Sequence, residues 1–201
     1  MVLLALLALA AGLLLGHFGA GFPLWDLLLH SQDGVLNLLM LSVGVSIGLQ
    51  RGIWQSMRRQ PAKVLVIPLG VTAGSLLGGV LCALLTGYPL AESASIAACM
   101  GWYSLGGVTI EALAGGVYGG VAFLSNLMRE ILSFFCIPLL AKYLNPAACI
   151  AAAGATSEDT TLPVMMKYTG EENVVLSVFN GVVCSAFVPV LLPLCYHLGL
   201  R

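Results

Sequence analysis

Long apolar runs, separated by short polar stretches, constrain this chain more than any other feature. They cover residues 1–22, 34–49, 63–85, 93–113, 118–141, 146–168 and 173–198. A membrane-crossing helix needs about 20 apolar residues, and the runs lack the alternation of membrane β-strands. We therefore expect an all-α polytopic membrane protein with about seven transmembrane helices, forming a single transmembrane domain over residues 1–201.

The scarcity of charge excludes several classes of protein. Charged residues make up 8% of the chain, whereas an ordinary soluble domain is about 25% charged. A soluble enzyme and a disordered chain are thereby excluded. A nucleic-acid-binding protein is excluded as well, since eight Lys and Arg residues form no basic patch. The six cysteines lie in apolar runs without a CxxC spacing, so we expect packing residues and no metal site or cofactor.

The distribution of basic residues predicts the orientation. Half of the Lys and Arg residues lie in the loop over residues 50–63, namely Arg51, Arg58, Arg59 and Lys63. The positive-inside rule places this loop in the cytoplasm, so the expected spans put the N-terminus inside and the C-terminus outside. The first run lacks a preceding Lys or Arg, and we interpret it as a span, not a signal peptide.

Charged residues interrupt the run 118–141 near its middle, in the segment 125–130. Adjacent helical residues point about 100° apart, so Arg129 and Glu130 are expected to meet different partners. Asn126 lies four residues before Glu130 and shares its face. We expect Glu130 to bind a cation or a proton, with Asn126 beside it and Arg129 at the site or balancing charge. The alternative is a structural ion pair that joins two helices.

A second polar interruption lies in the run 146–168, over residues 154–163. Pro163 disfavours helix for the residue before it, and an unwound stretch at bilayer depth is tolerated only against protein or a water-filled cavity. Its oxygen-rich side chains suit a cationic ligand; the candidates are Thr156, Ser157, Glu158, Asp159, Thr160 and Thr161. The alternative is a polar loop between two shorter helices.

A third interruption lies over residues 101–107 and is followed by Glu111. Trp102 and Tyr103 lie about ten residues into their span, too deep for an interfacial aromatic belt. They and Ser104 are candidates for a substrate path, where an aromatic ring would favour an ammonium group. The alternative is an interfacial position, which also applies to Glu111 near the end of the run.

The last two interruptions suggest an internal repeat. Ile96-Ala97-Ala98 and Ile150-Ala151-Ala152 each lead into a break, and the two segments are 54 positions apart (150 − 96). Interrupted helices at corresponding positions of two halves are typical of transporters with a central site. Ala-rich helices also match by chance, and the symmetry of such a repeat stays open.

Three motifs carry a family resemblance. They are Gly101-Trp102-Tyr103-Ser104-Leu105, the stretch from Phe123 to Leu127-Met128-Arg129-Glu130, and the segment 154–163. In this order they resemble the bacterial lysine exporter family LysO, formerly a domain of unknown function. The resemblance extends from about Gly34 to the C-terminus and weakly through the first span. It implies export of L-lysine, and of analogues such as thialysine, across the bacterial inner membrane.

The resemblance also implies a partner. Family members have two intramembrane acidic residues thought to be needed for transport; one matches Glu130, and the other lies in an N-terminal segment without a counterpart here. Some members are split into two polypeptides, and this chain resembles the longer, C-terminal one. We therefore expect a short N-terminal membrane subunit as partner; the alternative is a homo-oligomer. Asn126 stands where an aspartate occurs in a family member, which changes the number of buried negative charges.

The expected mechanism follows from the charges of lysine. Its ammonium is expected at Glu130 and Asp159, and its carboxylate at backbone N–H groups of a half-helix N-terminus within the segment 156–161. Export of a cation opposes the membrane potential, and no Walker A sequence is present. We therefore expect proton antiport, because burial favours the protonated form of a carboxyl group.

Two other function classes compete with a transporter. A channel could share the polar interruptions without coupling to protons, and a non-transport membrane scaffold subunit could use them for packing. An enzyme is not expected, because His17, His30 and His197 lie near span ends and no HExxH or GxSxG motif is present.

Overall fold

The computed structural model describes residues 61–198 continuously, together with residues 7, 11–12, 14–15, 38, 41 and 45. The chain divides into two compact units, residues 1–49 and residues 50–201; residues 61–198 belong to the second. The expected spans 1–22 and 34–49 and the side chains of the basic loop 50–63 lie outside the described residues, so the orientation stays a prediction.

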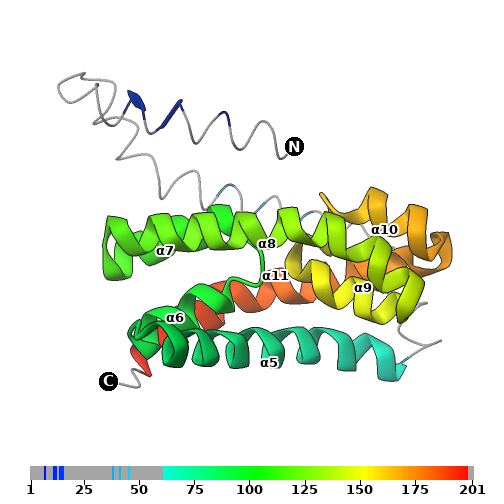
Figure 1. The fold of residues 1–201 in the computed structure, drawn as a ribbon, viewed down its shortest axis with the longest axis horizontal. Coiled ribbons are helices and arrows are strands. Elements are labelled where there is room, and N and C mark those ends of the chain that lie inside the picture. The colour runs from blue at the N-terminus through cyan, green and yellow to red at the C-terminus, as the bar shows by residue number, and fades with distance from the viewer. Residues whose placement is uncertain are drawn as a thin grey trace. The chain divides into compact units, whose positions relative to one another are not determined.

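The described part of the second unit consists of helices joined by short turns and contains no strands (Figure 1). Its elements are α5 (Pro61–Thr86), α6 (Leu90–Ala98), α7 (Tyr103–Ala114), α8 (Gly116–Tyr143), α9 (Pro146–Ala153), the 3-10 turn η1 (Gly154–Glu158), α10 (Leu162–Thr169), η2 (Glu171–Asn173) and α11 (Val174–His197).

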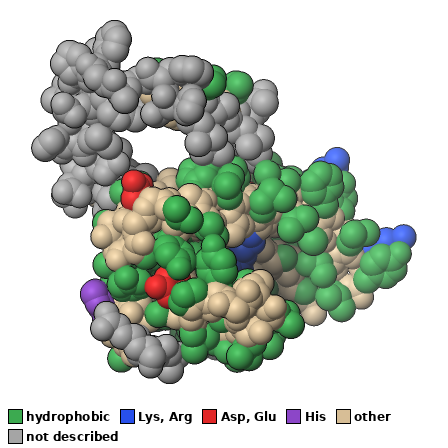
Figure 2. All heavy atoms as spheres, turned by 60° about the vertical axis from the view of Figure 1, so that its left-hand side comes forward, with side chains coloured by type: hydrophobic (Ala, Val, Ile, Leu, Met, Phe, Trp, Pro, Cys, Tyr) green, Lys and Arg blue, Asp and Glu red, His purple; other side chains and the backbone are tan. Residues whose placement is uncertain are grey.

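Within the described residues, three helical segments are long and apolar enough to cross a membrane: Val64–Thr86, Gly116–Tyr143 and Glu171–His197. They correspond to the expected spans 63–85, 118–141 and 173–198. Large apolar side chains on them are exposed; Leu85 is 86% exposed and Val117 is 77% exposed. Hydrophobic side chains cover most of the described surface in Figure 2. Such a surface suits lipid, because exposed apolar side chains are unfavourable in water but not in the apolar interior of a bilayer.

The run 93–113 does not form a single interrupted crossing helix, contrary to our expectation. α6 runs from one end of the unit to its middle, and α7 returns from the middle to the same end (Figure 1). The rings of Tyr88, just before α6, and Tyr118, just after α7, meet at that end with centroids 5.8 Å apart. The chain reverses because Met100 and Gly101 adopt φ angles of 48° and 103°, which end a helix.

This reversal also shifts the first break from its predicted position. The non-helical residues are 99–102, whereas the prediction was 101–107; Tyr103, Ser104 and the two glycines after Leu105 belong to α7. Gly106 packs closely there, since a Cβ atom on it would lie 2.5 Å from the Sγ of Cys99. These glycines therefore permit close packing and do not unwind the helix.

The run 146–168 forms a second hairpin in place of the expected interrupted span. α9 begins at the end where α8 stops and packs along α8, with the Cys149 thiol 3.6 Å from the Ile137 carbonyl oxygen. Gly154, with φ 65°, ends α9. The break covers residues 154–161, and Leu162 and Pro163 open α10 because proline fits the first helical turn. Figure 1 shows α10 returning to the end where α9 began.

The two hairpins come from opposite ends and touch at their tips. The backbone N–H of Ala155 donates to the Met100 carbonyl oxygen at 3.0 Å, and α11 packs against both α6 and η1. After α5, the described part is thus built from two similar halves, each a hairpin followed by a long helix: α6–α7 with α8, and α9–α10 with α11. This arrangement matches the repeat that the Ile-Ala-Ala segments suggested.

Candidate functional site

The tip of the first hairpin is held by Asn126 in the middle of α8. Its Oδ1 accepts from the Gly101 N–H at 2.9 Å, and its Nδ2 donates to the carbonyl oxygens of Ile96 (3.1 Å) and Ala122 (2.9 Å). Both amide donors are thereby used on backbone groups that lipid could not satisfy. Asn126 therefore supports the break. The sequence had suggested that its amide is a free ligand group beside Glu130, and the structure does not show this.

Asn180 in α11 has the same role at the second hairpin. Its Nδ2 donates to the Gly154 carbonyl oxygen and to the Ser157 hydroxyl, both at 3.0 Å, and its side chain is buried. We did not identify Asn180 from the sequence. The signal was present, because Asn180 follows Asn126 by 54 positions (180 − 126), the spacing of the two Ile-Ala-Ala segments.

Glu130 is the buried acidic group at the meeting point of the hairpins. It is 1% exposed, and neither carboxylate oxygen has a hydrogen-bond partner among the described residues. The side chains of Thr160 and Asp159 are neighbours of its carboxyl group, within electrostatic range. Thr160 does not form a hydrogen bond with it. The hydroxyl group of Tyr103 lies within electrostatic range of the carboxyl groups of Glu130 and Asp159. A buried, unpaired carboxylate is costly unless a proton or a cation compensates it.

Arg129 leaves α8 toward a different side, as the helical spacing predicted. Its Nη1 donates to the Ser75 hydroxyl of α5 at 3.0 Å. The guanidinium also lies against the tip of the second hairpin, since a Cβ atom on Gly154 would be 2.8 Å from Nη2. Arg129 and Glu130 form no ion pair with any described residue, so the structural ion pair that we weighed is absent from this part of the chain.

Three of the predicted hydroxyl ligands serve the backbone of the second break. Thr156 donates to the Ala153 carbonyl oxygen (2.9 Å), and Thr161 donates to that of Thr156 (2.8 Å). Ser157 and Ser177 of α11 each donate to the other's carbonyl oxygen at 2.8 Å. These hydroxyl groups close the turn and attach it to α11, in agreement with the structural alternative.

The two carboxylates of the second break differ in their surroundings. Glu158 accepts from the Ser185 hydroxyl of α11 at 2.8 Å. Asp159 accepts from the backbone N–H of Thr160 and, at 3.3 Å, from its hydroxyl. Asp159 and Thr160 thus lie with Glu130 and Tyr103 in one polar cluster, whereas Glu158 is turned toward α11.

The remaining predicted residues lie outside this cluster. Trp102 closes the first tip, because its backbone N–H donates to the Cys99 carbonyl oxygen at 2.8 Å. Ser104 lies half-buried in the first turn of α7. Glu111 is exposed and packs beside Gly119, near the start of α8. The structure therefore does not bring Glu111 to Glu130.

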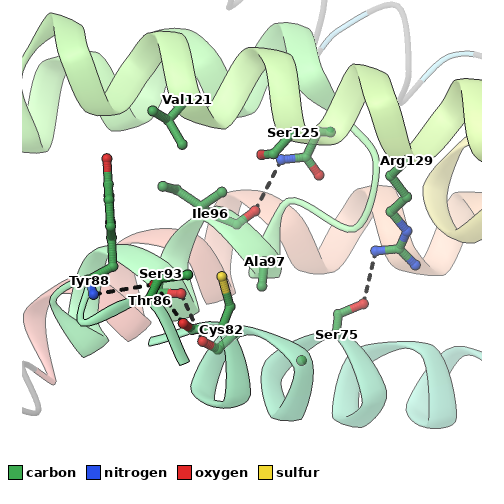
Figure 3. A pocket seen from close by; sticks show the side chains of 13 residues that line it. Ser75, Cys82, Thr86, Tyr88, Ser93, Ile96, Ala97, Val121, Ser125 and Arg129 are labelled. Atoms are coloured by element: carbon green, nitrogen blue, oxygen red, sulfur yellow. Dashed lines mark hydrogen bonds between the residues drawn. The ribbon is translucent and has the colours of Figure 1, made fainter. Parts of the chain in front are cut away.

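Two cavities lie along the side of α8 that carries Arg129. One, of about 450 Å³, is bounded by α5, α6 and α8 (Figure 3). The other, of about 410 Å³, lies toward α9; it also includes Ser75 and Arg129 in its lining. Within the described part of the chain, no three His, Cys, Asp or Glu side chains are gathered in a way that could hold a metal ion.

Comparison of the sequence with known proteins shows to which family the chain is similar. The family model described as "Lysine exporter LysO" matches residues 6–196. The "Putative lysine exporter" of Haemophilus influenzae is 37% identical over 121 residues, 60% of this chain and 62% of the relative. "Lysine exporter LysO" of Escherichia coli is 29% identical over 163 residues, 81% of this chain and 54% of the relative.

The chain thus spans between 54% and 62% of the length of these relatives. No solved structure matches it. The family model covers nearly the whole chain, including both hairpins and all three long helices. The chain therefore belongs to the lysine exporter LysO family.

Proposed function

We propose that this chain forms the substrate-translocating part of an L-lysine exporter in the bacterial inner membrane. The observation that carries the proposal is the buried carboxylate of Glu130, which lacks a hydrogen-bond partner among the described residues and lies where two broken hairpins meet. Discontinuous helices around a central charged group are a common way to build a transport site. The names of the relatives support lysine as the substrate.

In this proposal the side-chain ammonium of lysine compensates Glu130. Asp159, Thr160 and Tyr103 supply further oxygen atoms beside it. Moving the cation outward opposes the membrane potential by about 2.3 kcal/mol per charge per 100 mV, so an energy source is needed. A carboxylate that binds either a proton or an ammonium couples the two flows, because the ligands compete for one group. We infer lysine–proton antiport, and thialysine, with the same charges, as a second substrate.

The proposed topology places the two hairpins on opposite sides of the membrane. With the basic loop 50–63 in the cytoplasm, α6 and α7 dip in from the periplasm, and α9 and α10 from the cytoplasm. Lys142 and Lys167, in the last turns of α8 and α10, then both lie at the cytoplasmic end. Figure 2 shows basic side chains at one end of the unit.

We further propose a short membrane subunit that completes the transporter. The proposal rests on the length of the relatives, of which the chain spans little more than half. Co-purification with the products of neighbouring reading frames tests it. Recovery of a homo-oligomer with full export activity and no second polypeptide would refute it.

The function is tested by efflux of labelled L-lysine from cells that produce the chain together with these neighbouring products. Glu130→Gln removes the charge but keeps the size, and we expect export to fall by at least about tenfold. Glu172→Gln, at an exposed position in η2, is the matched control and should retain export. Undiminished efflux with inserted Glu130→Gln protein would exclude Glu130 from the mechanism.

A second measurement separates antiport from a channel. In vesicles, lysine flux is followed with and without an imposed pH gradient at zero membrane potential. Proton antiport predicts uphill lysine movement driven by the gradient, whereas a channel only equilibrates lysine.

A further inference from the structure

Among the described residues that line it, the cavity between α5, α6 and α8 has a positive charge and no acidic group. Its volume of about 450 Å³ falls within the range of small-molecule sites. Thr86, Tyr88 and Cys82 line one end, and Ser75 and Arg129 line the other (Figure 3). The charged residue in this described lining is Arg129.

The guanidinium of Arg129 has unused hydrogen-bonding capacity. It carries five N–H donors, and the one hydrogen bond that it makes to a described side chain goes to Ser75. A neutral hydroxyl does not compensate a positive charge at bilayer depth, where charges are rare and usually paired. The planar donor fork of arginine fits a carboxylate in a bidentate manner. The cavity therefore provides what an amino-acid carboxylate needs.

Arg129 also lies at the boundary of two cavities. It and Ser75 line both the 450 Å³ cavity and the 410 Å³ cavity toward α9. The hydrogen bond between them therefore lies in the lining that the two cavities share. A carboxylate that binds the guanidinium replaces a neutral acceptor with a charged one, which favours opening of the contact with Ser75.

We propose that Arg129 binds the α-carboxylate of the exported amino acid in the cavity between α5, α6 and α8. The proposal rests on the proposed export function and deepens it: Glu130 recognises the ammonium from one side of α8, and Arg129 recognises the carboxylate from another. An amino acid is thereby distinguished from a diamine, which has ammonium groups but no carboxylate.

Cys82 offers a test of the cavity that does not depend on transport. It is an exposed free thiol in the cavity lining. In a variant that keeps Cys82 and replaces the other five cysteines with alanine, the rates of modification by an anionic and a cationic methanethiosulfonate are compared. Arg129→Gln should lower the anionic-to-cationic rate ratio by at least about threefold, as loss of one nearby charge predicts. Lys167→Gln, outside the cavity, is the control. An unchanged ratio in Arg129→Gln would overturn the proposal.

The ligand is tested in the same Cys82 variant, with Arg129 intact. Millimolar L-lysine should slow modification, whereas L-lysinamide and cadaverine, which lack the carboxylate, should not. Equal protection by lysine and lysinamide would refute carboxylate recognition. Protection by phosphatidylglycerol but by no amino acid would show a lipid-phosphate site and would equally refute it.

Proteoliposome exchange distinguishes failure of this inference from failure of the proposed function. The wild-type chain, reconstituted together with any subunit that co-purifies with it, should exchange labelled lysine, with L-lysine competing at least about tenfold better than L-lysinamide; in the same assembly, Arg129→Gln should lose this preference. If the wild type exchanges no lysine, the export proposal fails, and a panel of other amino acids in the Cys82 assay still tests Arg129. If lysine is exchanged and Arg129→Gln keeps the preference, the assignment of Arg129 fails alone.

Discussion

At the residue scale, two asparagines form hydrogen bonds with the backbone groups at the helix breaks. Breaks in helices expose N–H and C=O groups, and within a bilayer no water is available to bond them. Asn126 supplies these bonds to the first tip and Asn180 to the second. Each short amide side chain offers two N–H donors and a carbonyl acceptor, whereas a carboxylate only accepts and a hydroxyl group has a single donor.

Replacement of Asn126 by alanine should destabilise the protein. It leaves the Gly101 N–H and the Ile96 carbonyl oxygen without a side-chain partner, and we expect a loss of about 2 kcal/mol or more. Asn145→Ala is the control, because Asn145 caps α9 at an exposed position and should cost about 1 kcal/mol. Thermal or denaturant unfolding in detergent measures the difference. Equal losses would contradict the supporting role of Asn126.

Glu130 should behave in the opposite way. Because its carboxylate is buried without a hydrogen-bond partner among the described residues, Glu130→Gln removes an unfavourable charge and should leave the unfolding midpoint unchanged or raised. Loss of export combined with full stability would mark Glu130 as functional. A large drop in stability would instead indicate an ion pair that holds the fold together.

At the scale of elements, glycine contacts hold α7 against α8. A Cβ atom on Gly119 would lie 2.6 Å from the Glu111 Cβ and 2.9 Å from the Gly107 carbonyl oxygen. Backbone cannot move away as a flexible side chain can, so the helices could not remain this close. Gly120, the next residue, has nothing within 4 Å of its Cβ position.

This pair of neighbouring glycines gives a matched prediction. Gly119→Ala should destabilise the protein by about 1–3 kcal/mol through overpacking, whereas Gly120→Ala should be neutral or slightly stabilising, because alanine favours helix. Unfolding midpoints of the two variants in one detergent are compared. Equal midpoints would contradict the close packing of α7 on α8.

At the scale of the whole unit, the hairpins determine on which side each loop lies. A hairpin puts the loops before α6 and after α7 on one side, whereas a crossing helix over 93–113 would put them on opposite sides. In a cysteine-free background, Tyr88→Cys and Gly116→Cys should both react with an impermeant reagent added from the periplasm. Leu144→Cys and Glu171→Cys should react only from the cytoplasmic side. Opposite accessibility of positions 88 and 116 would refute the hairpin.

Much of this organisation could be predicted from composition and local pattern. Apolar runs identified the three long helices of the described part. The Gly, Pro and hydroxyl residues marked the second break, and they placed the first break a few residues too late. Hydropathy and backbone freedom are properties of short segments, which is why local pattern reveals them. The spacing of Arg129 and Glu130 correctly predicted that the two side chains do not pair with each other. A carboxylate within an apolar run likewise drew attention to Glu130, which is buried; its role in binding stays a prediction.

Folding of the broken segments back on themselves was beyond what local pattern could reveal. A run of some twenty apolar residues with a central break is compatible with one crossing helix or with two half-helices side by side. The choice depends on contacts between residues far apart in the chain, such as Asn126 with Gly101, Asn180 with Gly154, and Ala155 with Met100. Membrane residence thus follows from the amino acids alone. The hairpins, the pocket at Arg129 and the structural role of the hydroxyl groups arise from packing, because hydrogen bonds at bilayer depth are satisfied only when distant segments meet.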